Sequence, residues 1–257
     1  MNLFFRKYGH GSKHLLILHG LFGMGDNWVT LARKFADFYT VWLPDMRNHG
    51  NSPHSHEIDY CIMAEDIAAF MHTHDINKAS LIGHSMGGKT AMMFAVQHPQ
   101  LVHDMVIVDI GPGATTAFTN HAEILHAIQS TVFTPDSTRH AIETGLLARI
   151  GDQRAVKLLM KNIIRSANGV LQWKLSHEAI SANAFRLTEA IHPAGSFTGR
   201  VLLVKGELSV YVTDEDVELM YDIFPLLSVI TIPEAGHWVH AENPEAFYQA
   251  CIEFLRP

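Results

Sequence analysis

The sequence predicts an α/β protein with a mostly parallel sheet, helices on both faces of the sheet and an inserted helical segment. The first observation is a set of short runs, rich in β-branched or aromatic residues and bounded by turn residues, that are typical of strands. The second is the helical spacing of apolar residues between several of these runs. The third is that this alternation stops between about residues 113 and 198.

Seven runs have the length and composition of strands, and their continuous apolar character is typical of strands that are covered on both faces. They lie at residues 3–8, 14–19, 40–44, 79–83, 105–110, 200–205 and 228–233. Between them, residues 60–74 and 86–97 have helical spacing. Alternation of strands and helices favours parallel pairing, so we expect one sheet of about seven strands.

Residues 113–198 carry helical patterns and no clear strand pattern. The predicted helices lie near 119–131, 136–149, 152–166 and 176–191, and are separated by Pro135, a turn at 167–169 and Pro193. An all-helical insertion in a series of βα units is typical of a lid over a site. We therefore expect a core made of residues 1–112 and 199–257, with a helical cap at 113–198.

Composition and charge argue against several classes of partner. Of the 257 residues, 47% are hydrophobic and 18% are charged, and the net charge is −7. The chain has no basic tract of five or more residues, so nucleic acid and anionic membranes are poor partners. Two distant cysteines, Cys61 and Cys251, fit a reducing compartment, and the chain has neither a signal-peptide pattern nor a membrane-spanning apolar run. We expect a cytoplasmic protein, whose oligomeric state the sequence does not indicate.

Residues 83–90, GHSMGGKT, match two motifs that both require a strand before and a helix after. One is the phosphate-binding P-loop, in which Lys89 and Thr90 would contact a nucleotide and Asp109 would hold Mg²⁺. The other is the G-x-S-x-G turn that carries a hydrolase nucleophile, here Ser85. A P-loop usually follows the first strand of its domain, whereas about three strands come first here. Only one helix fits between Lys89 and Asp109, so the sequence favours the hydrolase motif.

The hydrolase interpretation explains the residues around Ser85. Gly83 and Gly87 lie two positions before and after it, where a tight strand-to-helix turn leaves no room for side chains. A nucleophilic serine also needs a base. His237 follows the last predicted strand, at the same edge of the sheet as Ser85, and is our candidate. His240, one helical turn later, is the rival and is expected to begin a helix.

An oxyanion hole is predicted from HGLFG, residues 19–23, which follow the second strand run. A hole of this type takes one N–H from the residue after the nucleophile, here Met86, and one from this upstream loop. Leu21 is the first candidate for the second donor and Phe22 is the alternative. Apolar residues here and around the nucleophile predict an apolar substrate pocket, with Phe22 among its binding residues.

Other polar residues near these motifs are expected to be structural. In DMRNHGNS, residues 45–52, Arg47 and His49 are expected to brace the loop, and His84 is expected to pack and hydrogen bond beside the nucleophile. The 18 histidines include no H-E-x-x-H pair, and no G-x-G-x-x-G follows a strand. We therefore expect neither a metal nor a cofactor.

In this order, the motifs HGLFG, DMRNHGNSP, IGHSMGGK and GHWVHAENP resemble those of the α/β-hydrolase superfamily. The resemblance covers nearly the whole chain and is strongest in residues 14–112 and 200–256. It implies a serine esterase with a helical cap and no cofactor, acting on small acyl esters or, as an open alternative, on acyl thioesters. One departure is that a single strand run, 3–8, precedes 14–19, where the superfamily often has two.

The acid of the triad is where the sequence departs most from the superfamily pattern. The aspartate usually follows the strand after the cap, in a G-x-x-D context, but Ser209 occupies that position here. Asp109 is our first candidate, because it ends a strand at the same edge of the sheet and keeps the chain order serine, acid, histidine. The alternatives are Glu207, which is close to the expected loop, and Asp214 and Asp216, which are better placed to cap a helix.

Several other functions are compatible with these residues. The same fold and triad serve C–C bond hydrolases, cofactor-free perhydrolases and acyltransferases. A ligand receptor that retains the triad is the alternative outside enzymes, and a P-loop NTPase is the most remote. Burst release of an alcohol, tight binding without turnover, and nucleotide binding that needs Lys89 distinguish the three classes.

Overall fold

The computed structural model describes residues 1–115 and 118–256. Its main sheet has seven strands in the order β1-β3-β2-β4-β5-β8-β9, and all neighbours are parallel except β1 and β3. In chain order, β1 to β5, β8 and β9 span Phe5–Tyr8, His14–Leu18, Thr40–Pro44, Ala79–His84, Val102–Val108, Arg200–Gly206 and Leu227–Ile232. The predicted α/β class and the seven-stranded, mostly parallel sheet are confirmed.

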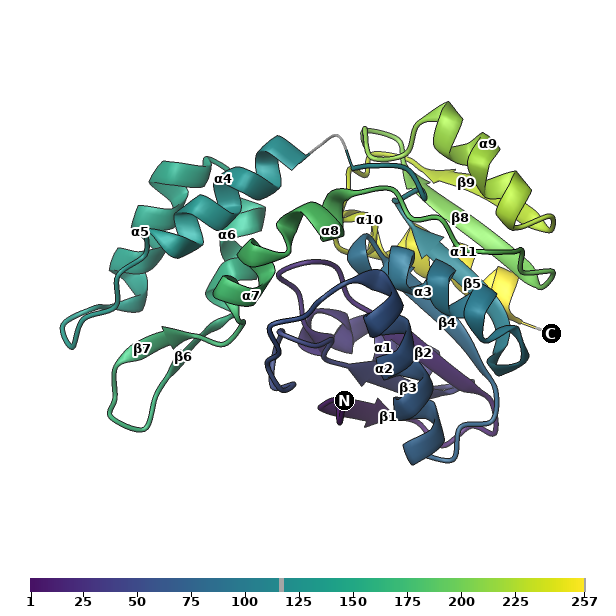
Figure 1. The fold of residues 1–257 in the computed structure, drawn as a ribbon, viewed down its shortest axis with the longest axis horizontal. Coiled ribbons are helices and arrows are strands. Elements are labelled where there is room, and N and C mark those ends of the chain that lie inside the picture. The colour runs from purple at the N-terminus through teal and green to yellow at the C-terminus, as the bar shows by residue number, and fades with distance from the viewer. Residues whose placement is uncertain (116–117, 257) are drawn as a thin grey trace.

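Helices cover both faces of the sheet (Figure 1). Along β2, Leu16 and Leu18 face one buried cluster while Leu15 and Ile17 face the other, as the two-residue period of a strand requires. The first face is covered by α2 (Tyr60–Thr73), α3 (Met86–Gln97) and α9 (Asp214–Ile223). The second is covered by η1 (Gly25–Trp28), α1 (Val29–Phe35) and α11 (Pro244–Leu255). Two short helices, η2 (Pro99–Leu101) and α10 (Val239–Glu242), precede β5 and α11.

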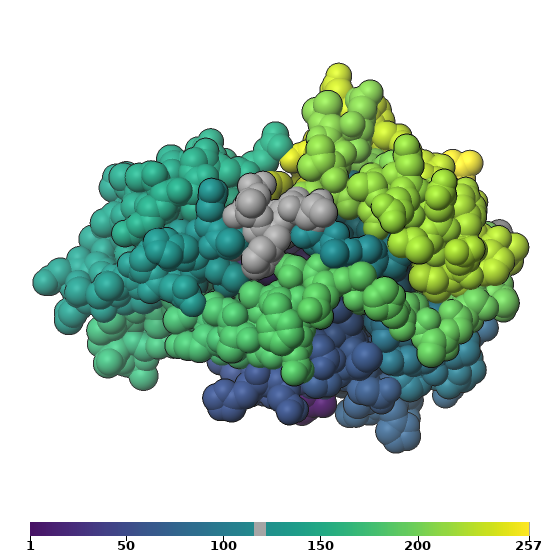
Figure 2. Space-filling model, turned by 45° about the horizontal axis from the view of Figure 1, so that its top comes forward, coloured from purple at the N-terminus to yellow at the C-terminus, as the bar shows by residue number. Residues whose placement is uncertain are grey.

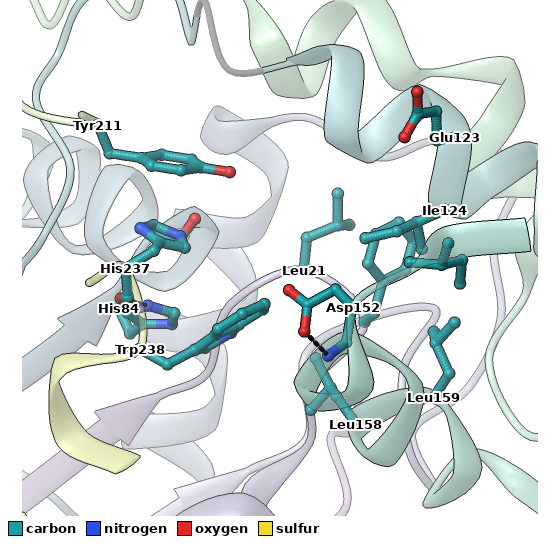
Figure 3. A pocket seen from close by; sticks show the side chains of 14 residues that line it. Leu21, His84, Glu123, Ile124, Asp152, Leu158, Leu159, Tyr211, His237 and Trp238 are labelled. Atoms are coloured by element: carbon teal, nitrogen blue, oxygen red, sulfur yellow. Dashed lines mark hydrogen bonds between the residues drawn. The ribbon is translucent and has the colours of Figure 1, made fainter. Parts of the chain in front are cut away.

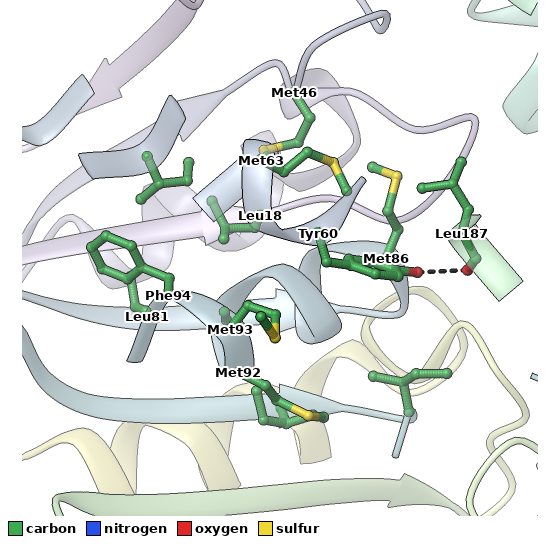
Figure 4. Packing of buried hydrophobic residues seen from close by; sticks show 14 of the residues in the cluster. Leu18, Met46, Tyr60, Met63, Leu81, Met86, Met92, Met93, Phe94 and Leu187 are labelled. Carbon is green, nitrogen blue, oxygen red and sulfur yellow. Dashed lines mark hydrogen bonds between the residues drawn. The ribbon is translucent and has the colours of Figure 1, made fainter. Parts of the chain in front are cut away.

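The first buried cluster is rich in methionine around α3 (Figure 4). Met63 of α2 and Met92 of α3 are fully buried there, beside Leu18 and Leu81 of the sheet. Unbranched methionine side chains fill irregular gaps between helices and sheet. This packing fixes α3, and with it the turn that precedes α3, against the carboxyl ends of the central strands.

The chain between β5 and β8 forms a lobe to one side of the sheet (Figure 1). Its elements are α4 (Phe118–Gln129), α5 (Arg139–Ile150), α6 (Gln153–Met160), β6 (Ile163–Arg165), β7 (Leu171–Trp173), α7 (His177–Ala182) and α8 (Ala184–Thr188). The Asn183 amide, between α7 and α8, donates to the carbonyl of His56 at 2.8 Å. Figure 2 shows the same junction, where the green atoms of this lobe lie over the blue atoms of the core.

The expectation that this lobe is entirely helical is wrong at one place. Residues 163–165, inside the predicted helix 152–166, form β6 and pair with β7 in an antiparallel hairpin. Its turn contains Asn168 and Gly169, with Gly169 at φ 82° and its N–H donating to Ser166 at 2.9 Å. Asn-Gly between two short apolar runs is a hairpin signal, and here this local turn prevails over the helical period.

Candidate active site

Ser85 sits on a strained turn between β4 and α3. Its backbone has φ 51° and ψ −116°, a region that residues other than glycine rarely occupy. A Cβ added at Gly83 would collide with the carbonyl of Gly87, and one added at Gly87 would collide with that of Leu18. Both glycines are therefore required by the close approach of the backbone, as the sequence predicts.

The turn places Ser85 at the amino end of α3 and in the lining of a cavity. Ser85 is 7% exposed, and its N–H donates to the carbonyl of Val108 in the adjacent strand β5. The first turn of a helix has N–H groups without intrahelical partners, and these favour negative charge. The position therefore suits a group that becomes an anion during a reaction.

His237 and Asp109 form a hydrogen-bonded pair at the edge of the sheet to which Ser85 belongs. Nδ1 of His237, in the loop after β9, lies 2.9 Å from Oδ2 of Asp109. Asp109 follows β5 directly and is completely buried. Its Oδ1 accepts the Gly206 N–H at 2.9 Å, and its Oδ2 also accepts the Ser209 hydroxyl. Ser209 thus occupies the position at which an aspartate is commoner. Its hydroxyl contacts the carboxylate of Asp109, which lies against His237 in place of that aspartate.

The alternative acids are engaged elsewhere. Glu207 accepts the backbone N–H of Glu234 at 2.9 Å. Asp216 forms a capping box with Thr213 at the start of α9 and accepts the Gly113 N–H at 3.0 Å. Asp214 is exposed in the first turn of the same helix. Asp109 is therefore the acid that the structure places against His237.

Tyr211 and Trp238, which are not among the predicted site residues, also line the cavity beside His237. The Tyr211 ring stacks on the His237 ring, with centroids 3.6 Å apart and planes 16° from parallel. Burial raises the pKa of Tyr211 to about 12, so its hydroxyl is neutral near pH 7. Its position two residues after Ser209, in the loop after β8, is the one sequence signal that points to the site.

The HGLFG loop presents Leu21 to the cavity, next to Ser85. In the described part of the chain, the Leu21 N–H has no hydrogen-bond acceptor. The Phe22 N–H, in contrast, donates to Nε2 of His49 at 3.2 Å. Leu21 is therefore better placed than Phe22 to donate to a substrate, while the Phe22 side chain lines the cavity.

The loop residues Arg47 and His49 brace their surroundings, as expected. Arg47 is buried and pairs with Asp66 of α2 at 2.6 Å. The His49 ring lies between the carbonyl of Arg47, at 2.9 Å, and the Phe22 N–H. His49 thereby holds the HGLFG loop in position.

His84 and His240 have packing roles beside the site. Nε2 of His84 lies 2.9 Å from the carbonyl of His237 and so supports the His237 loop. His240 lies within α10 and stacks on Trp28, with ring centroids 4.0 Å apart. Because His240 is buried against this aromatic ring, it is not placed to act as the base instead of His237.

The cavity has a volume of about 220 Å³. One wall carries Ser85, His237 and the loop residues described above, and the other comes from the lobe between β5 and β8 (Figure 3). The lobe contributes mostly apolar side chains together with two carboxylates, namely Ile124, Ile150, Ala155, Leu158 and Leu159 with Glu123 and Asp152. The site therefore suits a small acyl group beside a polar reacting centre.

Lys89 and Thr90 do not form a phosphate-binding loop. Lys89 is fully buried, and its ammonium donates to the carbonyls of Gly113 and Glu189. The Thr90 hydroxyl donates to the carbonyl of Met86, one helical turn earlier. Neither side chain is available to a nucleotide, which agrees with the preference for the hydrolase motif.

Four buried histidines around the site couple stability to pH. Desolvation lowers the pKa of His19 to about 4 and those of His49 and His240 to about 3, and it lowers that of His84 well below the usual 6.5. In the unfolded chain these groups bind a proton near pH 6.5. The stability that the neutral rings contribute is therefore complete above pH 6.5 and is lost as the pH falls toward about 4.

We expect the free energy of unfolding to fall between pH 7 and pH 5, by about 1.4 kcal/mol per pH unit for each such histidine below its unfolded pKa. Urea unfolding at pH 7, 6 and 5 measures this slope. His240→Gln should reduce the slope by about one proton, whereas His126→Gln, at an exposed position of α4, should not. A free energy that stays constant between pH 7 and pH 5 would contradict the expectation.

Two further properties concern the described residues alone. In residues 1–115 and 118–256, no group of three or more histidine, cysteine, aspartate or glutamate side chains is arranged to hold a metal ion. In the same part of the chain, none of the helices has the length and apolar character needed to cross a bilayer.

Comparison with known proteins matches residues 13–244 to the alpha/beta hydrolase fold family. The sn-1-specific diacylglycerol lipase ABHD11 of Danio rerio is 34% identical over 251 residues, which cover 96% of this chain and 79% of that protein. Esterase YbfF of Escherichia coli strain K12 is 29% identical over 249 residues, covering 96% of this chain and 94% of YbfF. The solved structure of a marine microorganism esterase is 40% identical, with a TM-score of 0.97 and 99% of both chains covered. The chain therefore belongs to the α/β-hydrolase fold family.

Proposed function

We propose that this protein is a carboxylic ester hydrolase that cleaves small acyl esters through Ser85, His237 and Asp109. The observation that carries the proposal is the hydrogen bond between Nδ1 of His237 and the buried carboxylate of Asp109, beside a serine on a strained turn. All three groups come from loops at the carboxyl edge of one sheet, where α/β folds place their sites. The esterase and lipase names of the similar proteins support the same activity.

In the proposed acylation step, Ser85 Oγ attacks the acyl carbonyl carbon while Nε2 of His237 takes the serine proton. Asp109 accepts a hydrogen bond from the N–H at Nδ1, so the imidazole is held in the tautomer whose Nε2 is free to take a proton. The buried carboxylate also stabilises the imidazolium that forms. His237 then gives its proton to the leaving alcohol oxygen as the ester C–O bond breaks.

The developing oxyanion is proposed to accept hydrogen bonds from the N–H groups of Leu21 and Met86. Both residues line a small crevice that also contains Ser85. Met86 begins α3, so the helix N-terminus adds a favourable field at the same point. Water then attacks the acyl-enzyme, with His237 as the base, and the carboxylic acid is released.

Tyr211 is proposed to position His237 within this sequence of steps. Its ring covers one face of the imidazole at stacking distance, and both rings line the substrate cavity. An aromatic cover keeps water from that face and limits the rotation of the imidazole. Tyr211 would thus support the alignment that the hydrogen bond from Nδ1 to Asp109 gives to His237.

Residues 113–198 are proposed to act as the cap of this site. Helices α4, α5 and α6 supply the apolar wall of the cavity opposite the catalytic groups. The volume of about 220 Å³ lies below the range of roughly 300–1,000 Å³ that is usual for ligand pockets. The cap would therefore select short acyl groups.

We expect kcat/KM to be highest for acyl chains of about two to eight carbons, extrapolating from the usual pocket volumes. A series of p-nitrophenyl esters and matched acyl-CoA thioesters, graded by chain length, measures this preference and compares esters with thioesters. Leu158→Ala, in the cavity wall, should move the optimum to longer chains, whereas Leu147→Ala, outside it, should not. A kcat/KM that keeps rising through long-chain lipids, with activation at an interface, would contradict the expectation.

The proposal itself is tested by pre-steady-state kinetics with p-nitrophenyl acetate. An acyl-enzyme predicts a burst of p-nitrophenol, equal to the concentration of active sites, when deacylation is the slower step. Ester binding without turnover would instead favour a receptor that retains the triad.

A further inference from the structure

Lys89 is a buried charge for which the proposed mechanism has no use. It lies in the first turn of α3, four residues after Ser85, and its side chain is fully buried. Desolvation lowers its pKa to about 8, so most of the side chain is still protonated near pH 7. In the described residues, no carboxylate forms an ion pair with this ammonium, although the charge of Asp216 favours its protonated form. A buried ammonium is costly unless other groups satisfy it.

The groups that satisfy Lys89 are two backbone carbonyls that are far apart in sequence. Nζ donates to Gly113 at 2.6 Å and to Glu189 at 2.9 Å. Gly113 lies where the chain leaves β5 for the proposed cap, and Glu189 lies where it returns after α8. Hydrogen bonds from a charged donor are stronger than neutral ones, and here one side chain joins both ends of the cap.

The two ends are also bonded to each other and to the core. The Thr115 N–H donates to the carbonyl of Thr188 at 2.8 Å, and the Ile191 N–H donates to that of Pro112 at 2.8 Å. From α2, the Tyr60 hydroxyl donates to the carbonyl of Leu187 at 2.6 Å (Figure 4). The Lys89 ammonium lies 5.7 Å from the centre of the Tyr60 ring, so the lysine and the tyrosine form one cluster.

The bonded ends lie directly beside the reacting groups. Thr115, Leu187 and Thr188 line the same small crevice as Ser85 and Leu21. A shift of either end would therefore move the wall next to the nucleophile and the proposed oxyanion donor. Because an ester must fit between this wall and Ser85, a clamp at this point sets how well the substrate is held.

We propose that Lys89 is a positioning residue that clamps both ends of the cap against the nucleophile helix and so sets the wall of the substrate cavity. Tyr60 is its partner on the returning end. This inference rests on the proposed roles of Ser85 and the cap. In a P-loop, the lysine of this motif binds phosphate. In this protein, Lys89 instead binds the carbonyl oxygens at the two ends of the cap.

The test is Lys89→Met, which keeps the length and apolar stem of the side chain and removes the donors. We expect kcat/KM for the preferred ester to fall about 10-fold to 100-fold, mainly through a higher KM, and the chain-length preference to flatten. Phosphonylation of Ser85 by a small fluorophosphonate should stay close to the parent's rate, because the triad is untouched. Hydrogen exchange at the Thr115 and Ile191 amides should become faster, since these amides bridge the two ends.

A matched tyrosine pair separates positioning from general stability. Tyr60 and Tyr39 are both buried, and each hydroxyl donates to a backbone carbonyl at 2.6 Å, but Tyr39 bonds Leu255, outside the substrate cavity. Tyr60→Phe should raise KM and speed exchange at the cap ends. Tyr39→Phe should lower stability by a similar amount and leave both properties unchanged. The pair decides the question even when Lys89→Met does not fold.

Two results would overturn the clamp. The first is a folded Lys89→Met protein with the parent's KM, chain-length profile and exchange at Thr115 and Ile191. The second is a loss of phosphonylation that matches the loss of kcat/KM, because the lysine would then act on Ser85 itself. A parent protein that is not labelled at Ser85 would reject the proposed function instead, while the exchange data would still report on the clamp.

Discussion

Replacing Ser85 by alanine is expected to lower kcat for acyl esters by about 10⁶, the scale of loss when a serine nucleophile is removed from a triad. The reason is that the covalent route disappears, while the cavity and the His237–Asp109 pair remain. Alanine has a Cβ like serine, so the strain at φ 51° is unchanged and the turn should persist. Hydrolysis of p-nitrophenyl acetate measures the loss, and circular dichroism checks the fold.

Ser80, in the strand β4 that precedes Ser85, offers a matched control. It is 5% exposed, close to the 7% of Ser85, but it does not line the substrate cavity. Ser80→Ala should keep the parent's kcat. Full esterase activity in Ser85→Ala would reject the hydrolase proposal, and ATP turnover that depends on Lys89 would favour the P-loop in its place.

Asp109→Asn is expected to lower kcat by about 10⁴, as in a triad whose acid is replaced by its amide. The orientation of the new side-chain amide follows from the hydrogen bonds that the Asp109 carboxylate makes in the parent protein. Because the Gly206 N–H needs an acceptor, the amide oxygen should take the place of Oδ1 and the amide NH₂ should face Nδ1 of His237. Nδ1 would then accept a hydrogen bond and the proton would move to Nε2, so the imidazole could no longer take the proton of Ser85.

The matched controls for Asp109 are the neighbouring acids that the structure places elsewhere. Glu207→Gln and Asp214→Asn should each stay within about tenfold of the parent, since residues that do not touch the reacting groups have small effects. Steady-state kinetics with intact circular dichroism is the measurement. A collapse of activity in either control, with Asp109→Asn active, would reassign the acid and leave Asp109 a structural residue at the end of a strand.

The sheet could be predicted from sequence because each strand carries its own signal. The runs that form the central strands are mostly apolar, and in the folded chain both faces of these strands are covered. The need for glycine at positions 83 and 87 could also be predicted, because the backbone approaches so closely there that no side chain fits. Such features depend on a few neighbouring residues, so one sequence is enough to reveal them.

The remaining features depend on contacts that a single sequence does not encode locally. The β6–β7 hairpin could not be predicted because each of its strands has only three residues. Strands this short do not interrupt the helical period of the residues around them. The stacking of Tyr211 on His237 joins the loops after β8 and β9, which meet only in the folded sheet. Likewise, the bonds of Lys89 to Gly113 and Glu189 span the whole cap. The roles of Ser85, His237, Asp109, Leu21 and Met86 stay predictions until kinetics test them.

Whether Ser85 is an activated nucleophile is measured most directly by labelling the native protein with a fluorophosphonate, followed by mass spectrometry of its peptides. An activated serine reacts with such reagents because its base and oxyanion donors are already in place. We expect a single adduct, on Ser85, whose yield rises in step with the loss of ester hydrolysis, and no labelling after denaturation. An adduct on another residue, or full ester hydrolysis by protein that is labelled at Ser85, would contradict it.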